Sequence, residues 1–510
     1  MPTSFSSGPW PANPLLYEIN TRVWLAELSQ KAGQPITLDR VPSEEIDRIA
    51  RLGFQAVWLM GVWTSNGSEA VRVARTLPDL LNEYKHALPD YKTEDIIGSP
   101  YAINDYMVSP TLGGPAALAS FRNRIARFGM KLMLDFVPNH LSRDHWLVNE
   151  QPDIFVRGSK EDLARDPSSF FANTKGDVIA FGRDPYFPAW TDTAQINYGS
   201  NTGRDAMKKA LFSIAEQCDG VRCDMAMLVL PEIIERVWGS RLGNNWNRNS
   251  FWKEAIAEVK ARNPHFLFMA EAYWNLEWQL QQHGFDFTYD KTLSDRLRAN
   301  DNNGVRQHLQ AEKAYQQHCA RFLENHDEPR AASAFGLARS KPAATVSFFS
   351  PGLKLFHEGQ LEGRRVKLPV QLGRRPKESE DIETAMFYEK ILSILQDPIF
   401  QNGVFSTRAV QPAGWGDSSN DALIALSWSP GPEMKSSSLL GYLCVANLNA
   451  WRAYGRIPLP AETFSNSRQY VFTDRLDGKR YERSGGELLS PGIYVALEAH
   501  QQHIFEIQAK

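Results

Sequence analysis

The sequence is poor in cysteine, in surplus charge and in long apolar runs. Its four cysteines are dispersed and show no metal-type pairing, which excludes a disulfide framework and a cysteine-based zinc site. The 56 basic and 59 acidic side chains nearly cancel, and the net charge of -3 provides no electrostatic footprint for nucleic acid or an anionic membrane. A neutral substrate fits this balance better than a polyanion.

No stretch of the sequence predicts a signal peptide or a membrane span. The N-terminal MPTSFSSGPWPANPLL lacks a basic region followed by an apolar one, and no run approaches the roughly 20 apolar residues that cross a bilayer. Because cysteine is also sparse, we expect a soluble, cytoplasmic protein without a membrane partner. His140 and His145 miss the i, i+4 spacing of a helical zinc site, so we expect no zinc enzyme.

Strands and helices alternate along most of the chain. A strand is predicted over 16–24, a helix begins at Ser43, and a short buried strand follows over 56–63, which is the signal of a parallel sheet. The alternation continues to about residue 400 and provides eight strands. The sequence therefore predicts an α/β fold built on a (β/α)8 TIM barrel.

Two regions depart from this alternation. Between about 141 and 190 the periodicity fades and Asp, Pro, Gly and aromatic residues dominate, which predicts a subdomain inserted after strand 3 of the barrel. Beyond about residue 401, short alternating segments are divided by Gly, Pro, Asn and Ser, which is typical of an antiparallel β-sandwich. The predicted domains are a leader (1–13), a catalytic barrel with its insertion (14–400) and a C-terminal β-sandwich (401–510).

The stretch DGVRCDM places charged residues in an otherwise apolar strand. Residues two apart in a strand point to the same face, so Arg222 and Asp224 are expected side by side, with the guanidinium keeping the carboxylate ionised. For Arg222 alone a structural ion pair is an equally good explanation, and the two-residue offset favours a catalytic one. The pair is typical of a carboxylate that acts as a nucleophile.

Two further carboxylates, Glu271 and Asp327, follow predicted strands. Catalytic groups of a TIM barrel lie at the C-terminal ends of several strands, whereas an isolated acidic residue is usually a surface charge or a helix cap. Glu271 has apolar and aromatic neighbours, so desolvation should raise its pKa and keep it protonated, unlike Asp224. A retaining glycosidase needs a carboxylate nucleophile and a carboxylic acid about 5 Å apart.

Other side chains are expected to contact the sugar. Asp327 would bind sugar hydroxyls and favour ring distortion, helped by hydrogen bonds from His140 and His326, although a histidine of this kind is most often structural. Tyr101 would supply a stacking platform. Trp274 would line a sugar subsite, and the alternative for this tryptophan is a place in the core.

The stretches that carry these residues, DFVPNH, GVRCD, AEAY and ENHD, resemble in this order the four signature stretches of the α-amylase family, glycoside hydrolase family 13. AQINY resembles its weaker fifth stretch, and the resemblance extends from about Pro14 to Lys510. It implies a (β/α)8 barrel with an insertion after the third strand and a C-terminal β-sandwich. It also implies residue roles: the nucleophile Asp224, the general acid/base Glu271, the transition-state stabiliser Asp327, the contacts Arg222, His140 and His326, and the stacking tyrosine Tyr101.

The sequence departs from the family after the nucleophile. Many starch-cleaving amylases have a Lys-His pair there, which serves an acceptor subsite and a calcium site, but this chain has Met227 and Leu228. We therefore expect no calcium-dependent endo-amylase, no metal and no cofactor. Asn139 keeps calcium open as an alternative by resemblance, although an Asn at a strand end is most often a turn cap.

The sequence thus predicts a retaining hydrolase of a small or oligomeric α-glucoside, which works through a covalent glycosyl-aspartate and has no nucleic-acid partner. A transglycosidase with the same residues is the alternative, because the outcome depends on which acceptor reaches the intermediate first. A non-catalytic carbohydrate-binding or scaffold relative is disfavoured, since such relatives commonly lose the carboxylates. The basic stretch 363–377 is either solvated surface or the place of an anionic acceptor. No pattern indicates an oligomeric state.

Overall fold

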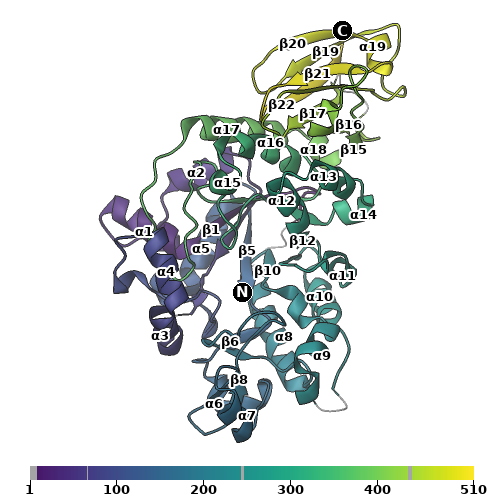
Figure 1. Cartoon of the computed structure of the whole chain (residues 1–510). Helices are drawn as coiled ribbons and strands as arrows, with labels where there is room; N and C mark the ends of the chain where they lie inside the picture. Colours follow the sequence, from purple (N-terminus) through teal and green to yellow (C-terminus); the bar gives the residue numbers. More distant parts are fainter. Residues whose placement is uncertain (1–7, 66, 243–245, 435–438) are drawn as a thin grey trace.

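The computed structural model describes residues 8–65, 67–242, 246–434 and 439–510. Its centre is a closed barrel of eight parallel strands (Figure 1). In chain order these strands are β1 (Leu15–Asn20), β2 (Ala56–Met60), β5 (Lys131–Phe136), β10 (Gly220–Cys223), β11 (Leu267–Ala270), β12 (Phe287–Tyr289), β13 (Cys319–Arg321) and β14 (Leu353–His357). Each strand pairs with the next, and β14 returns to pair with β1. The predicted TIM barrel is confirmed.

Side chains of the barrel strands alternate between the interior and the surrounding helices. In β1, Leu16 belongs to the interior cluster, whereas Tyr17 and Ile19 pack in the outer core. Because successive residues of a strand point to opposite faces, Glu18 follows Leu16 into the interior. Large apolar side chains fill that interior, so a site can open only at an end of the barrel: Leu16, Trp58, Met133, Met269, Phe287 and Leu355.

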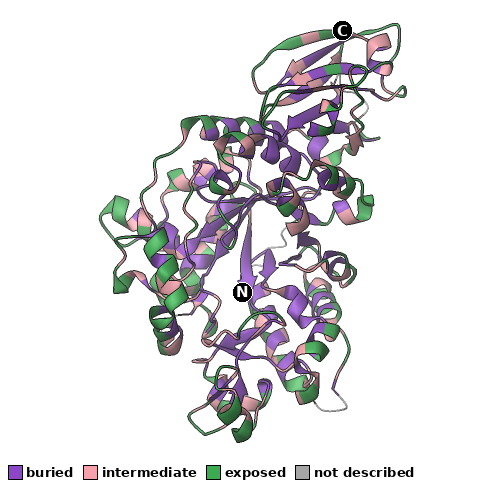
Figure 2. Cartoon of the chain, viewed as in Figure 1, coloured by how far each residue is buried: buried purple, intermediate pink, exposed green. Residues whose placement is uncertain are grey.

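Helices surround the barrel, with their outer faces exposed and the strands buried (Figure 2). Between barrel strands lie α1 (Thr21–Ala32), α2 (Ser43–Arg51), α5 (Gly114–Ala126), α8 (Asn201–Ala215), α9 (Pro231–Trp238), α10 (Phe251–Arg262), α11 (Glu277–Gln282), α12 (Lys291–Arg298), α13 (Asn302–Leu309), α14 (Lys313–Gln316), α15 (Ala331–Ala334) and α16 (Leu337–Phe348). After β14 come α17 (Ile382–Leu395) and α18 (Ile399–Asn402). Alternate strands and helices thus form the two layers of the barrel.

Two excursions extend the barrel at the C-terminal ends of its strands. The first, after β2, contains β3 (Trp63–Thr64), α3 (Ser68–Thr76), α4 (Pro78–Ala87) and β4 (Asp105–Val108). The second follows β5, the third barrel strand, and contains β6 (His140–Ser142), α6 (Leu147–Glu150), α7 (Lys160–Arg165), β7 (Phe170–Ala172), β8 (Val178–Ala180) and β9 (Thr193–Gln195). There β6 pairs antiparallel with β9, and β7 with β8. The predicted insertion after strand 3 is confirmed.

Antiparallel sheets complete the chain and lie at the top of Figure 1. One sheet has the order β15-β16-β17-β22-β19-β20, and β18 pairs with β21 in a second. Their inner faces share one apolar cluster, as expected of the predicted sandwich. The elements are β15 (Val404–Arg408), β16 (Leu423–Ser429), β17 (Leu439–Asn447), β18 (Ala453–Ile457), β19 (Gln469–Asp474), β20 (Arg480–Ser484), α19 (Gly485–Leu489), β21 (Ile493–Leu497) and β22 (Gln502–Ala509).

Some expected boundaries differ from the structure. The strand predicted over 16–24 is wrong beyond Asn20, because the Asn20 side chain accepts a hydrogen bond from Val23 N at 3.5 Å and starts α1. The domain limits stay a prediction: residues 1–7 of the leader lie outside the described residues, and residue 401 falls within α18. Among the described residues, no helix is long and apolar enough to cross a membrane.

Candidate active site

The site is built around Arg222, which is fully buried at the C-terminal end of β10. Its neighbours Val221 and Cys223 face the outer core, so Arg222 and Asp224 share the interior face of the strand. Arg222 Nη1 lies 2.6 Å from Asp224 Oδ1, and Arg222 Nη2 lies 2.8 Å from Glu271 Oε2. One guanidinium therefore holds both carboxylates at the same end of the barrel.

Glu271 follows β11 and is only 3% exposed. Its Oε2 accepts a hydrogen bond from Met225 N at 2.6 Å, and its Oε1 accepts one from the Tyr273 hydroxyl at 2.9 Å. Burial raises the pKa of Glu271 to about 7, assisted by the nearby Asp224 charge and only partly opposed by Arg222. Such a carboxyl group both gives and takes a proton near neutral pH.

Asp327 lies beyond β13, with its side chain 44% exposed toward the cavity, and contacts His326. His326 Nε2 lies 2.9 Å from Asp327 Oδ2 and 2.7 Å from the Tyr101 hydroxyl. The Tyr101 and His326 rings stack, with centroids 5.4 Å apart. Partial desolvation on the cavity floor would raise the pKa of Asp327, but the His326 and Arg222 cations outweigh it and hold the pKa well below its usual range. Asp327 is thus a permanent anion beside a charged histidine.

A cavity of about 1120 Å³ opens above these groups, and Tyr101, His140, Asp224, Glu271 and Asp327 are among the residues that line it. Both excursions supply its walls, which include Leu77, Leu80, Tyr186, Phe187 and Trp190. The His140 ring lies 5.2 Å from the Trp190 ring, centroid to centroid. Trp274 is not among the lining residues, and packs edge-on against Tyr186 with centroids 4.9 Å apart. Its contact with the wall is therefore indirect.

Residues 42–386, about two thirds of the chain, match the family model described as alpha amylase, catalytic domain. The chain belongs to the α-amylase family. A curated relative, alpha-amylase MalA from Haloarcula japonica, is 25% identical over 364 residues, which are 70% of this chain. The chain spans only 45% of the length of that relative.

Solved structures share the fold. The noncanonic maltogenic alpha-amylase AmyB from Thermotoga neapolitana has a TM-score of 0.68 at 18% identity, with 98% of this chain and 99% of that chain covered. The alpha-amylase GTA from Geobacillus thermoleovorans, complexed with acarbose, has a TM-score of 0.65 at 16% identity, with coverages of 99% and 100%. The debranching enzyme from Nostoc punctiforme, soaked with acarbose, has a TM-score of 0.63 at 16% identity, and both chains are 98% covered. At these identities the likeness shows the fold of this α-amylase family member.

Sequence reasoning missed two buried carboxylates at this end of the barrel, Glu18 and Asp135. Glu18 Oε1 lies 2.5 Å from His326 Nδ1. Asp135 Oδ2 accepts a hydrogen bond from Gly61 N at 3.0 Å, and burial raises the pKa of Asp135 to about 6 despite Arg222. A single acidic residue inside an apolar strand, as in LLYEIN and KLMLDF, was the signal for both.

Asn139, the residue that would ligate calcium by resemblance, lies against the Gln195 amide. Gln195 Nε2 donates hydrogen bonds to Asn139 Oδ1 at 3.0 Å and to Asn139 O at 2.9 Å. An amide donor therefore faces the oxygen that would ligate a cation. In the described part of the chain, no group of three or more His, Cys, Asp or Glu side chains could hold a metal. The Asn139 side chain is thus engaged by Gln195, and the absence of calcium stays a prediction.

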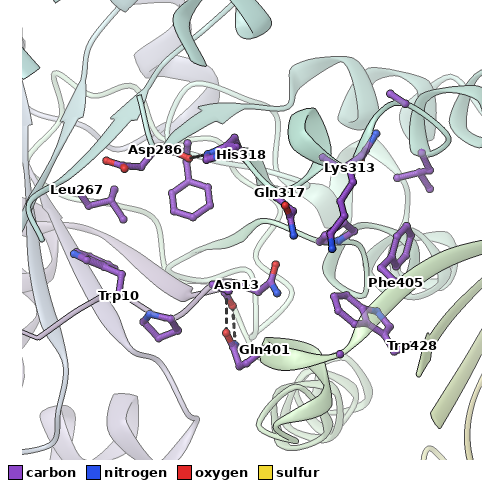
Figure 3. A pocket seen from close by; sticks show the side chains of 18 of the residues that line it. Trp10, Asn13, Leu267, Asp286, Lys313, Gln317, His318, Gln401, Phe405 and Trp428 are labelled. Carbon is purple, nitrogen blue, oxygen red and sulfur yellow. Dashed lines mark hydrogen bonds between the residues drawn. The ribbon is translucent and has the colours of Figure 1, made fainter. Parts of the chain in front are cut away.

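A second cavity, of about 690 Å³, lies at the N-terminal end of the barrel strands and reaches β15 and β16 (Figure 3). Its lining includes Trp10, Leu267 and Phe405, and Gln401 Nε2 donates a hydrogen bond to Asn13 O at 2.9 Å on its floor. None of the carboxylates Asp224, Glu271 and Asp327 lines this cavity. The chemistry therefore belongs to the first cavity, at the opposite end of the barrel.

Proposed function

We propose that this protein is a retaining hydrolase of α-glucosidic bonds in a small or oligomeric α-glucoside. The observation that supports this most directly is the placement of Asp224 and Glu271 on two nitrogens of one buried guanidinium, at the floor of the cavity. Burial raises the pKa of Glu271 to about 7 although it shares the guanidinium with Asp224, so Glu271 is available as an acid at neutral pH. Two carboxyl groups in different protonation states are what retaining hydrolysis requires.

In the first step, Asp224 attacks the anomeric carbon while protonated Glu271 gives its proton to the glycosidic oxygen. The bond between that carbon and oxygen breaks, the aglycone leaves, and a glycosyl ester forms on Asp224. Positive charge develops on the sugar ring, and the anionic Asp327 stabilises it while binding the ring hydroxyls. His140 and His326 bind the same sugar, and Tyr101 stacks on its face.

In the second step, Glu271 is a carboxylate and takes a proton from water. The hydroxide that forms attacks the anomeric carbon, the ester to Asp224 breaks, and the sugar leaves with its original anomeric configuration. A pKa of about 7 suits both steps, since the same group must be an acid first and a base afterwards. Arg222 stays charged throughout, because contact with Glu271, Tyr289, Tyr101 and Asp224 outweighs burial and raises its pKa well above the usual value.

The apolar walls support an elongated carbohydrate. Phe187 is 64% exposed at the cavity, which leaves an aromatic face free to pack on a sugar ring beyond the cleaved one. The same face suits an acceptor sugar, so transfer instead of hydrolysis is the second candidate function. We propose that neither calcium nor another cofactor takes part. The cytoplasmic location stays a prediction from composition.

The experiment is to incubate the protein with maltooligosaccharides, sucrose and trehalose and to follow the first product by proton NMR. The α-anomer is expected at first, with the β-anomer growing only through mutarotation. Products longer than the substrate, or products of an added acceptor sugar, would establish transfer. An initial β-anomer contradicts retention, and no reaction with any α-glucoside contradicts the proposed function.

A further inference from the structure

Glu18 has no role in the reaction described above, yet it is the carboxylate in closest contact with a substrate-facing histidine. It lies in the middle of the apolar β1 and is 0% exposed. Its Oε1 is 2.5 Å from His326 Nδ1 and 3.4 Å from the backbone N of His326. Its Oε2 has no hydrogen-bond partner among the described residues. All its polar side-chain contacts in that part of the chain are thus directed at one residue.

A buried carboxylate without a counter-charge is costly, and Glu18 has no lysine or arginine in ion-pair contact within the described residues. The group that can supply the charge is His326. The other ring nitrogen of His326, Nε2, faces Asp327 Oδ2 at 2.9 Å. A carboxylate only accepts hydrogen bonds, and the Tyr101 hydroxyl, 2.7 Å from Nε2, can accept as well as donate. Protons on both ring nitrogens therefore satisfy Glu18, Asp327 and Tyr101 together. A ring protonated on both nitrogens is an imidazolium cation.

We propose that Glu18 is a positioning residue that holds His326 as an imidazolium and thereby keeps Asp327 ionised and oriented toward the sugar. Glu18 does not touch the substrate. The inference rests on the proposed function for its kinetic consequence, but the charge of His326 is measurable without any substrate.

The geometry also explains why such a cation does not oppose the reaction. Glu18, His326 and Asp327 together carry one negative charge, since two anions flank one cation. That net charge favours the positive sugar ring of the transition state. Packing fixes the ring between Tyr101, which stacks on it, and Trp58, which meets it edge-on with centroids 5.5 Å apart. Glu18 therefore determines the protonation of a ring whose orientation is already fixed.

Other charged groups around His326 do not change this conclusion. Burial lowers the pKa of His326, but the adjacent Asp327 and Glu18 carboxylates outweigh it and raise the value to about 10. Burial and Arg330 lower the pKa of His357, on β14, to about 3, so His357 is neutral. The other titratable or charged groups that face this end of the barrel include Asp135 on β5, Arg222 on β10, Tyr289 on β12, Tyr101 before β4, Arg330 after β13, and Glu358, Lys367 and Arg375 after β14.

The decisive measurement is nitrogen NMR of the full chain labelled at histidine. Eleven histidines give signals, and His326 is assigned by its loss in His326→Asn. In the wild type, both ring nitrogens of His326 are expected to stay protonated at pH 8. A singly protonated, neutral His326 at pH 8 overturns the proposal at once, without any variant.

Glu18→Gln keeps the size and the hydrogen-bond acceptor but removes the charge. We expect the pKa of His326 to fall by at least one unit, and kcat/KM to fall roughly ten- to hundredfold, mainly through kcat, because a charge-assisted contact is weakened. Glu18→Asp keeps the charge and should keep His326 doubly protonated. It serves as the second variant if Glu18→Gln does not fold.

The matched control is Glu324→Gln. Glu324 is equally buried three residues after β13. Its carboxylate accepts hydrogen bonds from Arg330 Nη1 at 2.7 Å and Ala331 N at 2.6 Å, lies 3.3 Å from His357 Nδ1 and does not contact His326. The control should leave the His326 titration unchanged. If Glu18→Gln also leaves the His326 titration unchanged, the positioning role of Glu18 is refuted. If the wild type is inactive but its His326 is doubly protonated, only the proposed hydrolysis is refuted.

Discussion

Replacing Glu271 with glutamine should remove the acid and the base of the reaction while leaving its binding contacts in place. The glutamine oxygen can accept the hydrogen bond from Met225 N, and its amide group can donate to the Tyr273 hydroxyl, which serves as donor or acceptor. Arg222 loses the Glu271 charge beside its Nη2, but Asp224 stays 2.6 Å from Nη1 of the same guanidinium. We therefore expect Glu271→Gln to fold normally, with a melting temperature near that of the wild type.

The size of the effect follows from the environment of Glu271. With the ordinary pKa of 4.5, about one molecule in 300 would hold the proton at pH 7, whereas about half do so at a pKa of about 7. Burial thus raises the share of molecules with an active acid roughly 150-fold. A positioned general acid contributes about 10²- to 10⁴-fold to a rate. We expect kcat/KM on maltooligosaccharides to fall about 10³-fold, which corresponds to ~4 kcal/mol.

The assay compares a maltooligosaccharide with α-glucosyl fluoride, because fluoride leaves without a proton. Glu271→Gln should release about one fluoride per enzyme molecule in a burst and then stall, since no base activates water for the second step. Azide attacks without a base and should restore turnover. In the wild type, the protonated acid is lost as the pH rises through about 7, so cleavage of the maltooligosaccharide should slow there while the fluoride burst does not.

The control for this assay is Tyr273→Phe, which removes one hydrogen bond to Glu271 and keeps the acid. Tyr273→Phe should lower kcat/KM no more than roughly tenfold on either substrate. Equal losses on both substrates for Glu271→Gln, with no rescue by azide, would falsify the assignment of Glu271 as acid and base.

Three further predictions concern the nucleophile, a metal and the backbone. Asp224→Asn should lower kcat roughly 10⁴-fold or more. A fluorinated glucosyl fluoride should label the wild type, but not the variant, on the peptide that contains Asp224, and mass spectrometry identifies that peptide. A label on another peptide would contradict the assignment of Asp224 as the nucleophile. EDTA should change neither the rate nor the melting temperature, since Gln195 occupies the Asn139 oxygen, and a calcium-restorable loss would contradict this. Gly352→Ala should lower the free energy of unfolding, measured with denaturant, by about 2–4 kcal/mol, because Gly352 has φ +101 and a Cβ there would lie 2.1 Å from Cys319 O. Gly478 has φ +78 but open space around it, so Gly478→Ala should lower the free energy of unfolding by only about 1 kcal/mol. An equal loss of stability in both variants would contradict the predicted clash between the alanine Cβ at position 352 and Cys319 O.

The architecture was predictable because it depends on periodicities that act locally. Apolar strands alternating with amphipathic helices left a parallel barrel as the natural solution, and the loss of that alternation after the third strand marked the insertion. Element ends were less predictable. The apolar run after Asn20 continues into α1, and only the capping contact of the Asn20 side chain shows where β1 stops.

The candidate site was predictable where residues share a strand. The offset between Arg222 and Asp224 needs only the two-residue repeat of a strand. Glu18 is different, because its partner His326 lies 308 positions away along the chain. No local pattern couples two such residues, and only the closure of the barrel, which brings β1 beside β14 and next to the end of β13, makes them neighbours.

Three of the five non-glycine residues with positive φ in the described part of the chain lie within four positions after the two proposed catalytic carboxylates. Met225 follows Asp224 with φ 41, and Trp274 and Asn275 follow Glu271 with φ 64 and 60, values that side-chain-bearing residues rarely adopt. Met225 N donates a hydrogen bond to Glu271 Oε2 at 2.6 Å, so the strained residue after one strand contacts the acid after the next. The two strand ends act as one unit because a single strained peptide and a single guanidinium join them.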